Sequence, residues 1–241
     1  MKISAYGYTN RGGRPHNEDR ICWAAEEGGG VFVVADGLGG HSRGEVASAL
    51  AAAAVFRGCR EREEMTREAM EEVFQKANEA VLEGQKTPGQ EEMRTTAVAL
   101  DLRGGRAVWG HAGDSRLYRF SSGGLAFVTG DHSVTYKKFL AGEISAMDVY
   151  HDDDRSSLLR VLGKPGARGD TGAAALQSGD AFLLCTDGFW EYVYQEEMLA
   201  DWLKSTTPEQ WVELMLLRHI RRTPPGNDNF SVIAVFVEEE L

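Results

Sequence analysis

The feature that most constrains this chain is an apolar run that stops at an acid and a glycine. Residues 31–40 read VFVVADGLGG, so five apolar residues lead directly to Asp36 and Gly37. Residues 182–188 repeat the pattern as FLLCTDG, which ends at Asp187 and Gly188. Such runs predict buried strands, so each acid is expected at the rim of a sheet, where glycine lets backbone approach whatever the acid binds. The two acids are therefore predicted to be paired ligands.

An alternative interpretation is local, because Asp-Gly is also typical of tight hairpin turns. Either dipeptide alone favours a turn. Three further segments, however, place acids beside strand-like runs in the same way: residues 17–19 (NED), 111–116 (HAGDSR) and 227–229 (NDN). Five acid-bearing segments placed in this way are hard to attribute to turns alone.

Composition sets the class of protein. With 241 residues, 42% hydrophobic and 26% charged, the chain can bury a core, and we expect one domain over residues 1–241. The formal net charge of -11 argues against a nucleic-acid partner, since that binding depends on clustered Lys and Arg. Bound divalent ions would explain part of the acid excess.

The cysteines indicate the compartment. Cys22, Cys59 and Cys185 are odd in number and lie in apolar stretches, which suggests core thiols in a reducing compartment rather than disulfides or a zinc site. No signal-peptide pattern opens the sequence, and the longest apolar stretch, residues 46–56, is too short to span a bilayer. A cytoplasmic location without membrane contact is the resulting expectation.

Strands fall into two groups and helices mostly into two pairs, which predicts an α+β layered domain. Helices are expected at residues 47–56, with Ser42 and Glu45 as a capping box, at 70–84, at 134–141 and at 207–221. Hairpin turns are expected at residues 104–105 and 123–124, and residues 151–155 are expected to be a solvated acidic loop. Strands are expected at residues 3–9, 21–25, 31–35, 95–102, 106–111, 116–120, 173–176, 181–185 and 230–237.

The donor set points to a hard metal. The acidic edges supply carboxylates and, at Gly37, a backbone carbonyl, whereas no pair of His or Cys has ligand spacing. Oxygen ligands favour Mg²⁺ or Mn²⁺ over Zn²⁺. Crowding the carboxylates of Glu18, Asp36, Asp187 and Asp228 without counter-charge would force some of them to bind protons, and two divalent ions would remove that repulsion.

Two such ions suit hydrolysis of a phosphate ester. At a separation of about 3.5–4 Å they can hold a bridging water, whose pKa falls from about 15.7 towards neutrality, for in-line attack on phosphorus. Asp36, central and backed by glycine, is the candidate to bridge the ions. Arg14 lies four residues before Glu18, and its forked guanidinium is the natural group to bind the phosphate oxygens.

These residues resemble a known family. Arg14 with residues 17–19, Asp36-Gly37 followed by Gly39-Gly40, residues 113–116 (GDSR), Asp187-Gly188 and Asp228-Asn229 resemble, in this order, the motifs of the metal-dependent (type 2C) protein serine/threonine phosphatases. The match spans nearly the whole chain, and its length resembles that of the stand-alone bacterial catalytic domains. The resemblance implies a four-layer α/β/β/α sandwich, with two antiparallel sheets flanked by helix pairs and the metal site at one end. Residues 131–162 would form the family's variable flap.

The resemblance also implies roles. Asp36 would bridge two metals, with Glu18 and the Gly37 carbonyl completing one and Asp187 and Asp228 the other. Arg14 would bind the substrate phosphate. Asp114 would join Asp187 in holding a third, weaker ion, while Asp19 and Asn229 would support the ligands from behind.

Two departures concern the general acid and a glycine. Leu38 stands where eukaryotic members carry a histidine thought to protonate the leaving group, and Arg94 stands where the family usually has glycine. His41 could act as a substitute acid but is better explained as a surface or capping group, so His41→Ala is expected to change kcat little. Whether His16, His111 and His132 support the site is left open by the sequence.

The expected function is hydrolysis of phosphoserine and phosphothreonine in proteins by a metal-bridging hydroxide, without a phosphoenzyme. The partners would be phosphoproteins and an opposing kinase, and the protein would be a monomer. One alternative is a catalytically silent binding or sensor module, which has no need to keep every acid. Another is a two-metal nuclease, which the net charge of -11 disfavours.

Overall fold

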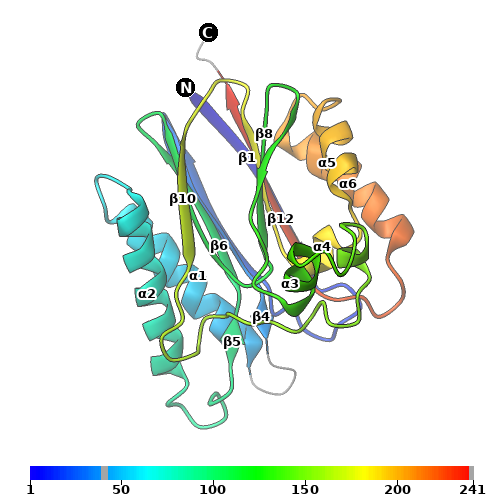
Figure 1. Cartoon of the computed structure of the whole chain (residues 1–241). Helices are drawn as coiled ribbons and strands as arrows, with labels where there is room; N and C mark the ends of the chain where they lie inside the picture. The colour runs from blue at the N-terminus through cyan, green and yellow to red at the C-terminus, as the bar shows by residue number, and fades with distance from the viewer. Residues whose placement is uncertain (39–42, 239–241) are drawn as a thin grey trace.

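The computed structural model describes residues 1–38 and 43–238. Within these ranges, a pair of five-stranded antiparallel sheets stack face to face (Figure 1). The first sheet has the order β1-β12-β11-β8-β9 and the second the order β10-β7-β6-β3-β2. The strands of the first sheet are β1 (Lys2–Asn10), β12 (Phe230–Glu238), β11 (Ala181–Cys185), β8 (Arg116–Ser121) and β9 (Gly124–Val128). Those of the second are β10 (Asp170–Ala175), β7 (Arg106–Ala112), β6 (Ala97–Arg103), β3 (Gly29–Ala35) and β2 (Arg20–Glu26).

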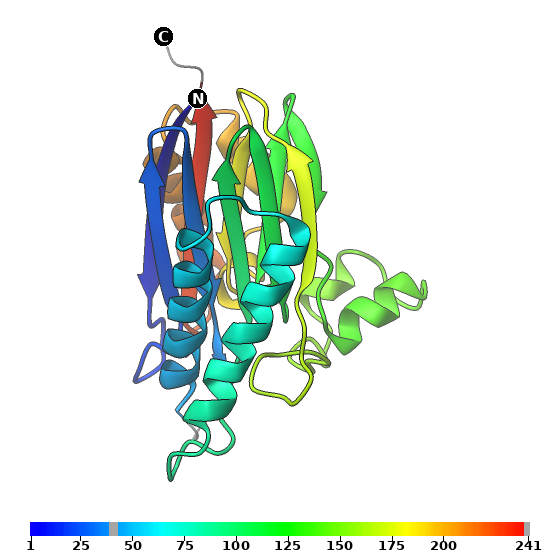
Figure 2. The ribbon, with the colours of Figure 1, turned by 90° about the vertical axis from the view of Figure 1, so that its left-hand side faces the viewer.

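Helices cover the outer face of each sheet. The pair α1 (Gly44–Arg60) and α2 (Arg67–Gly84) packs on the second sheet, as Figure 2 shows from that side. The first sheet is covered by α6 (Pro208–Arg222), which packs on β1 and β12 and carries α5 (Gln195–Trp202) beside it. The predicted α/β/β/α sandwich is confirmed.

The four layers enclose three buried apolar clusters. Each central strand contributes side chains to two of these clusters, one on each face of its sheet. In β3, Phe32 and Val34 face the space between the sheets, whereas Val31 and Val33 face the α1/α2 pair. Successive side chains of a strand point to opposite faces, so a strand buried on both faces is apolar throughout. This explains why the run before Asp36 has no polar residue.

Most predicted elements are present, with longer bounds. Residues 95–102, however, divide into β5 (Arg94–Thr95), which pairs with β4 (Gly37–Leu38), and β6. The N-cap residue of helix α1 is Arg43, which makes no side-chain cap hydrogen bond, so the prediction of Ser42 as the cap is wrong. Ser42 itself lies outside the described residues. At the second predicted turn, Gly124 already belongs to β9, a strand that sequence reasoning missed.

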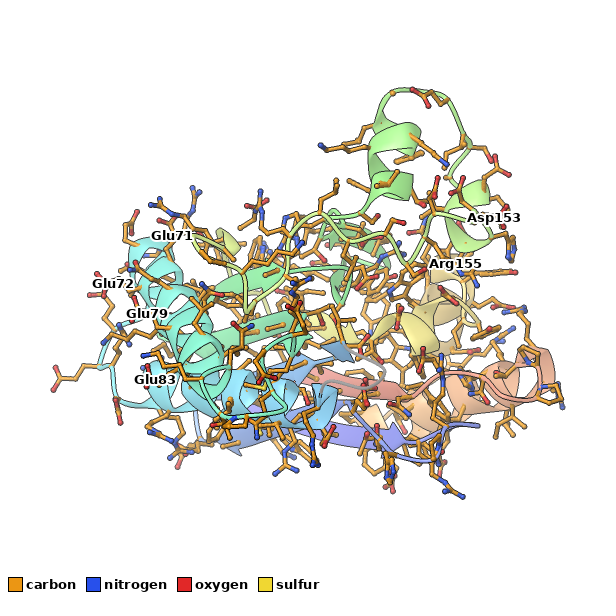
Figure 3. The ribbon with its side chains drawn as sticks, turned by 90° about the horizontal axis from the view of Figure 1, so that it is seen from below. Glu71, Glu72, Glu79, Glu83, Asp153 and Arg155 are labelled. Atoms are coloured by element: carbon orange, nitrogen blue, oxygen red, sulfur yellow. The ribbon has the colours of Figure 1, made fainter. Side chains whose placement is uncertain are left out.

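The segment 131–162 projects from one end of the sandwich, at the lower right of Figure 2. It contains α3 (Val134–Leu140), as predicted, and a short 3-10 helix, Asp148–Tyr150. Residues 151–155 form an acidic loop with no buried residue, as expected, and Lys138 binds two of its members, Asp152 at 3.1 Å and Asp154 at 2.7 Å. Figure 3 labels the exposed Asp153 and the half-buried Arg155, which binds Glu191 at 2.9 Å.

All three cysteines are free thiols, which agrees with the prediction that they form no disulfide. Among the described residues, no helix is both long and apolar enough to pass through a bilayer.

Candidate metal centre

Three aspartates from separate strands meet at one end of the sandwich. Asp36 follows β3, Asp114 lies two residues after β7, and Asp187 opens the short helix α4 (Asp187–Trp190) after β11. One carboxylate oxygen from each lies within 4.8 Å of the others. Neither Asp-Gly pair is a two-residue hairpin, since Gly37 begins β4 and Gly188 lies in α4. The local interpretation of these dipeptides is therefore wrong.

Glu18 and the Gly37 carbonyl lie side by side next to this group. A Cβ atom added to Gly44 would approach Glu18 Oε2 to 2.4 Å and the Gly37 oxygen to 2.9 Å. Only glycine at position 44 leaves room for both oxygens. The Gly37 N–H also donates to the Glu18 carbonyl at 3.2 Å, which fixes the two segments to each other.

Arg14 and Asp228 form an ion pair at the mouth of the site. The guanidinium of Arg14 donates to Asp228 Oδ2 at 2.8 Å, and both side chains are about half exposed. A Cβ atom added to Gly188, the residue after Asp187, would lie 3.5 Å from the Asp228 Cβ, and the charge of Asp228 raises the pKa of Glu18, Asp36 and Asp187. The structure thus brings every acid predicted as a ligand into one neighbourhood, with the predicted phosphate-binding arginine beside it.

Asn229 and Asp19 hold the acidic segments from behind. The Asn229 amide accepts from the Glu18 N–H at 2.8 Å and donates to the carbonyls of Arg11 and His16. Asp19 Oδ2 accepts from the hydroxyls of two buried residues, Thr186 at 3.0 Å and Ser231 at 2.7 Å. These contacts tie the loop before β2 to β12 and to the turn that precedes Asp187.

A second set of hydroxyls fixes the backbone of Asp36 and was not predicted. Its N–H donates to Thr96 Oγ1 at 3.1 Å, and its carbonyl accepts from Thr95 Oγ1 at 2.7 Å. Thr96 Oγ1 in turn lies 2.7 Å from Ser115 Oγ. The signal in the sequence is a hydroxyl residue inside or next to an apolar run, because a buried hydroxyl needs a hydrogen-bond partner.

Mutual repulsion and burial act on the protonation of these acids. Burial, followed by the charge of Asp187, raises the pKa of Asp36 well above its ordinary value. The same two causes raise the pKa of Asp114, and burial raises the pKa of Asp187 and of Glu18. Burial raises the pKa of Asp19 to about 7. Carboxylates so close together cannot all be charged without a cation between them.

Two buried carboxylate oxygens of this site, Asp114 Oδ1 and Asp19 Oδ1, lack any partner in the described structure. An unpaired buried carboxylate oxygen is costly, so its presence needs an explanation. The group around it consists of oxygen donors only, which is the set that Mg²⁺ and Mn²⁺ prefer. The residues present therefore fit divalent metal ions.

A second group, His111, His132 and Asp170, lies at the start of β10 but is poorly suited to a metal. His132 Nδ1 accepts from the Gly113 N–H at 3.1 Å, so the proton of the neutral ring sits on Nε2, 3.0 Å from Asp170. That nitrogen has no free lone pair for an ion. Arg160 also pairs with the same Asp170. His111 and His132 are stacked at 4.6 Å and act as structural groups beside the Gly113 turn.

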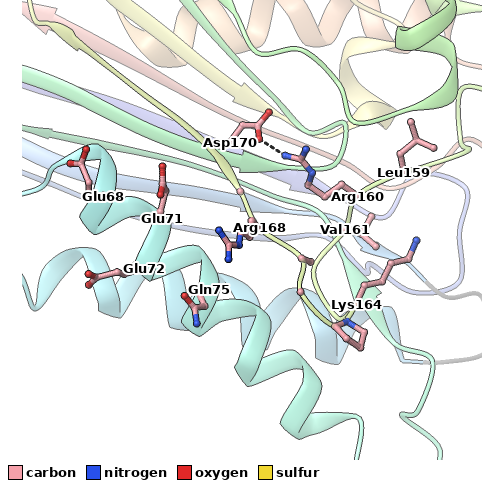
Figure 4. A pocket seen from close by; sticks show the side chains of 14 residues that line it. Glu68, Glu71, Glu72, Gln75, Leu159, Arg160, Val161, Lys164, Arg168 and Asp170 are labelled. Carbon is pink, nitrogen blue, oxygen red and sulfur yellow. Dashed lines mark hydrogen bonds and ion pairs between the residues drawn. The ribbon is translucent and has the colours of Figure 1, made fainter.

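A groove of about 760 Å³ lies elsewhere on the described surface (Figure 4). It lies between α2 and residues 159–170 and contains none of the clustered acids. Its α2 wall belongs to an exposed acidic row, four members of which are labelled in Figure 3: Glu71, Glu72, Glu79 and Glu83. Some of the negative charge is therefore spread over a solvated helix face rather than gathered at the metal centre.

The two departures from the family pattern lie opposite each other. Leu38 in β4 pairs with Arg94 in β5, and the guanidinium of Arg94 binds Glu92 at 2.9 Å. Nothing in the structure explains why arginine stands at position 94. Gly39, Gly40 and His41 lie outside the described residues.

Comparison with known sequences agrees with this geometry. Residues 6–213 match the family described as protein phosphatase 2C. The serine/threonine phosphatase Stp of Listeria monocytogenes is 32% identical over 244 positions, which cover 94% of this chain and 93% of that protein. The serine/threonine protein phosphatase PstP of Mycobacterium tuberculosis is 30% identical over 93% of this chain but only 43% of its own length.

Solved structures show the same arrangement of elements. The crystal structure of the M. tuberculosis phosphatase PstP superimposes with a TM-score of 0.88 at 27% identity, covering 99% of this chain and 100% of that one. A structure of the PstP catalytic domain in complex with two manganese ions gives a TM-score of 0.87 at 25% identity over 99% of each chain. The ordered motifs, the sandwich and these matches lead to one conclusion: the chain belongs to the protein phosphatase 2C family.

Proposed function

We propose that this protein is a metal-dependent protein serine/threonine phosphatase that uses Mn²⁺ or Mg²⁺. The observation that carries the proposal is the meeting of Asp36, Asp114 and Asp187, from the ends of three strands, with one oxygen of each within 4.8 Å of the others. The relatives carry the same activity in their names, and the PstP domain binds two manganese ions. A silent module is not favoured, because every acid of the site is retained.

The ligand roles are those that the family resemblance implies, and the positions of the residues support them. Asp36 would be shared by two ions, one also held by Glu18 and the Gly37 carbonyl and the other by Asp187 and Asp228. Asp114 would join Asp187 in holding a third, weaker ion. When bound, such ions polarise a phosphate ester and activate water. Asn229 holds the backbone of Glu18, and Asp19 binds the hydroxyls of Thr186, which precedes Asp187, and of Ser231.

Arg14 is assigned to the phosphate of the substrate. Its guanidinium lies at the mouth of the site and can present two parallel N–H donors to phosphate oxygens. Asp228 holds it in position from one side, so the arginine is oriented before substrate arrives. Leu38 cannot donate a proton, so no side chain at that position serves as the general acid.

The remaining assignments are predictions on the same basis. Residues 1–241 form one catalytic domain with a flap at 131–162, and the substrates are phosphoproteins produced by an opposing protein kinase. A monomeric state, a cytoplasmic location and the lack of a nucleic-acid partner stay predictions from composition, cysteine usage and the net charge of -11.

The test is phosphate release from a phosphothreonine peptide by purified protein with Mn²⁺, before and after chelation. We expect activity that chelation abolishes and Mn²⁺ restores, and a loss of at least about a hundredfold in Asp36→Asn, which removes one charge at the centre of the site. Equal rates for wild type and Asp36→Asn would refute the proposal. Digestion of DNA or RNA under Mn²⁺ would support a nuclease instead.

A further inference from the structure

Arg116, the last residue of the HAGDSR motif, is a buried cation with a single ionic partner among the described residues. Its guanidinium donates to both oxygens of Asp131, from Nε at 2.8 Å and from Nη2 at 2.6 Å. The two side chains are only 8% and 3% exposed. Burying a charge is costly unless it is paired in good geometry, so this pair is a built feature rather than a surface contact. Asp131 is the first residue of the flap segment.

The same guanidinium lies flat against a tryptophan of α4. The Arg116 carbon between the nitrogens is 3.4 Å from the centroid of the Trp190 ring. Trp190 is itself 2% exposed, and its indole N–H donates to the backbone carbonyl of Asp114 at 2.9 Å. A continuous chain of contacts therefore runs from Asp131 through Arg116 and Trp190 to Asp114.

The turn that carries Asp114 is also held from its other side. The Gly113 carbonyl accepts from the His132 N–H at 3.0 Å, and the Gly113 N–H donates to His132 Nδ1 at 3.1 Å. Gly113 has a φ of +105°, and a Cβ there would lie 2.5 Å from a Thr96 methyl. The start of the flap and the Gly113-Asp114 turn are thus joined at two points.

The anchoring of this turn affects the position of the Asp114 carboxylate. One of its oxygens lies in the group formed with Asp36 and Asp187, while Oδ1 is buried without a partner among the described residues. The Asp114 carboxyl is held by its own backbone through a local hydrogen bond and has no side-chain hydrogen-bond partner among the described residues, so its position follows that of the Asp114 backbone. Trp190 supplies the one side-chain hydrogen bond to that carbonyl in the described structure.

We propose that Trp190, oriented by Arg116 and Asp131, is a positioning residue that fixes the backbone of Asp114 so that its carboxylate can hold a divalent ion together with Asp187. This role rests on the proposed metal function of Asp114. It involves Arg116 and Asp131 in metal binding although neither touches the cluster of acids. It also makes the start of the flap and the weaker metal site members of one rigid unit.

The chain offers a matched control for the obvious objection that Trp190 is simply a core residue. Trp211 is also fully buried, and its indole N–H donates to the Met198 carbonyl at the same 2.9 Å distance. Trp211 lies on α6 and shares the apolar cluster of the first sheet with Trp190, but its hydrogen bond goes to α5 and not to the turn that carries Asp114. Trp190→Phe and Trp211→Phe therefore remove the same kind of hydrogen bond from the same kind of environment.

The experiment is calorimetric titration of the metal-free full chain with Mn²⁺, for wild type and both variants. We expect wild type to bind two ions tightly and one more weakly. In Trp190→Phe the weaker binding constant should fall about threefold to tenfold, the worth of one hydrogen bond, with tight binding unchanged. Trp211→Phe should lower the melting temperature without changing either class of site.

A second pair of variants tests the stacking. Arg116→Lys keeps a charge for Asp131 but loses the flat guanidinium, so it should weaken the third ion as Trp190→Phe does. Arg218→Lys alters the bidentate pair between Arg218 on α6 and Asp201 on α5, and it should leave the binding of the third ion unchanged. Identical isotherms for Trp190→Phe and Trp211→Phe, or a wild type that saturates with two ions, would overturn the proposal. A wild type that binds no Mn²⁺ would instead refute the proposed function itself.

Discussion

At the scale of single residues, the metal centre is a set of acids that the fold holds together against their mutual repulsion. Asp36, Asp114, Asp187 and Glu18 all have raised pKa values, and Asp19 has a pKa of about 7. The sequence predicted which acids would meet, because each follows or precedes an apolar run. Apolar runs also mark the hydroxyls of Thr96, Thr186 and Ser231 as buried, but the sequence could not predict which groups they bind, since those partners are fixed only by tertiary structure.

The raised values predict how stability of the metal-free protein depends on pH. A carboxyl whose folded pKa is raised binds its proton more tightly in the folded state, so its stabilising contribution is present at low pH and is lost as pH rises through the folded pKa. We expect the melting temperature of chelated protein to fall between about pH 5 and pH 8, through the range in which Asp19 titrates. Thermal unfolding by circular dichroism measures this.

The matched variant for that experiment is Asp36→Asn, which removes one of the repelling charges. Its melting temperature should fall less over the same pH range, by a few degrees for each kcal/mol of repulsion removed. Added Mn²⁺ should raise the melting temperature of wild type more at pH 8 than at pH 5, because protons compete for the ligands. Parallel pH profiles for wild type and variant would show that these acids do not interact as described.

Arg14 carries a separate prediction. A charge-assisted hydrogen bond is worth about 1.5–3 kcal/mol, so Arg14→Ala should lower kcat/KM for a phosphothreonine peptide about tenfold to a hundredfold. Arg14→Lys should recover little, since an ammonium cannot form the bidentate fork. Mn²⁺ binding should be retained in both variants. An unchanged kcat/KM would remove Arg14 from the phosphate site.

At the scale of secondary structure, sequence pattern succeeded where one local signal dominates. The start of α6 was predicted from Thr207-Pro208, and Thr207 indeed caps the helix, accepting from the Gln210 N–H at 3.1 Å. The cap predicted for α1 was wrong, because Arg43 is the N-cap residue and a Ser-x-x-Glu pattern alone does not decide which residue begins a helix. Strand β9 was missed because it is a short edge strand whose residues, GLAFV, alternate weakly.

The cap of α6 is testable by itself. Thr207→Ala removes a hydrogen bond to an otherwise unpaired helix N–H and should destabilise the protein by about 1 kcal/mol. Phosphatase activity and Mn²⁺ affinity should not change, because the cap lies in the outer layer away from the acids. Denaturant unfolding quantifies the loss, and Thr66→Ala at the cap of α2 provides a second case of the same contact. A stability equal to that of wild type would contradict the role of the cap.

At the scale of the whole molecule, two stacked sheets bring segments that are far apart in sequence to one end of a sandwich. Glu18, Asp36, Asp114, Asp187 and Asp228 lie on separate connections at that end, and the α/β/β/α order follows from strands that bury both faces. The layered class could be predicted from the segregation of helices and strands. Strand order could not, since antiparallel pairing of distant segments such as β1 and β12 leaves no local pattern.

The central claim is that these acids form one site for at least two divalent ions, with Asp36 between them. The most direct test is the number of Mn²⁺ ions bound per chain, measured by calorimetric titration of chelated protein and of Asp36→Asn. The account predicts two or more ions in wild type and loss of tight binding in the variant. Tight binding of the same number of ions by both proteins, or no binding by wild type, would contradict it.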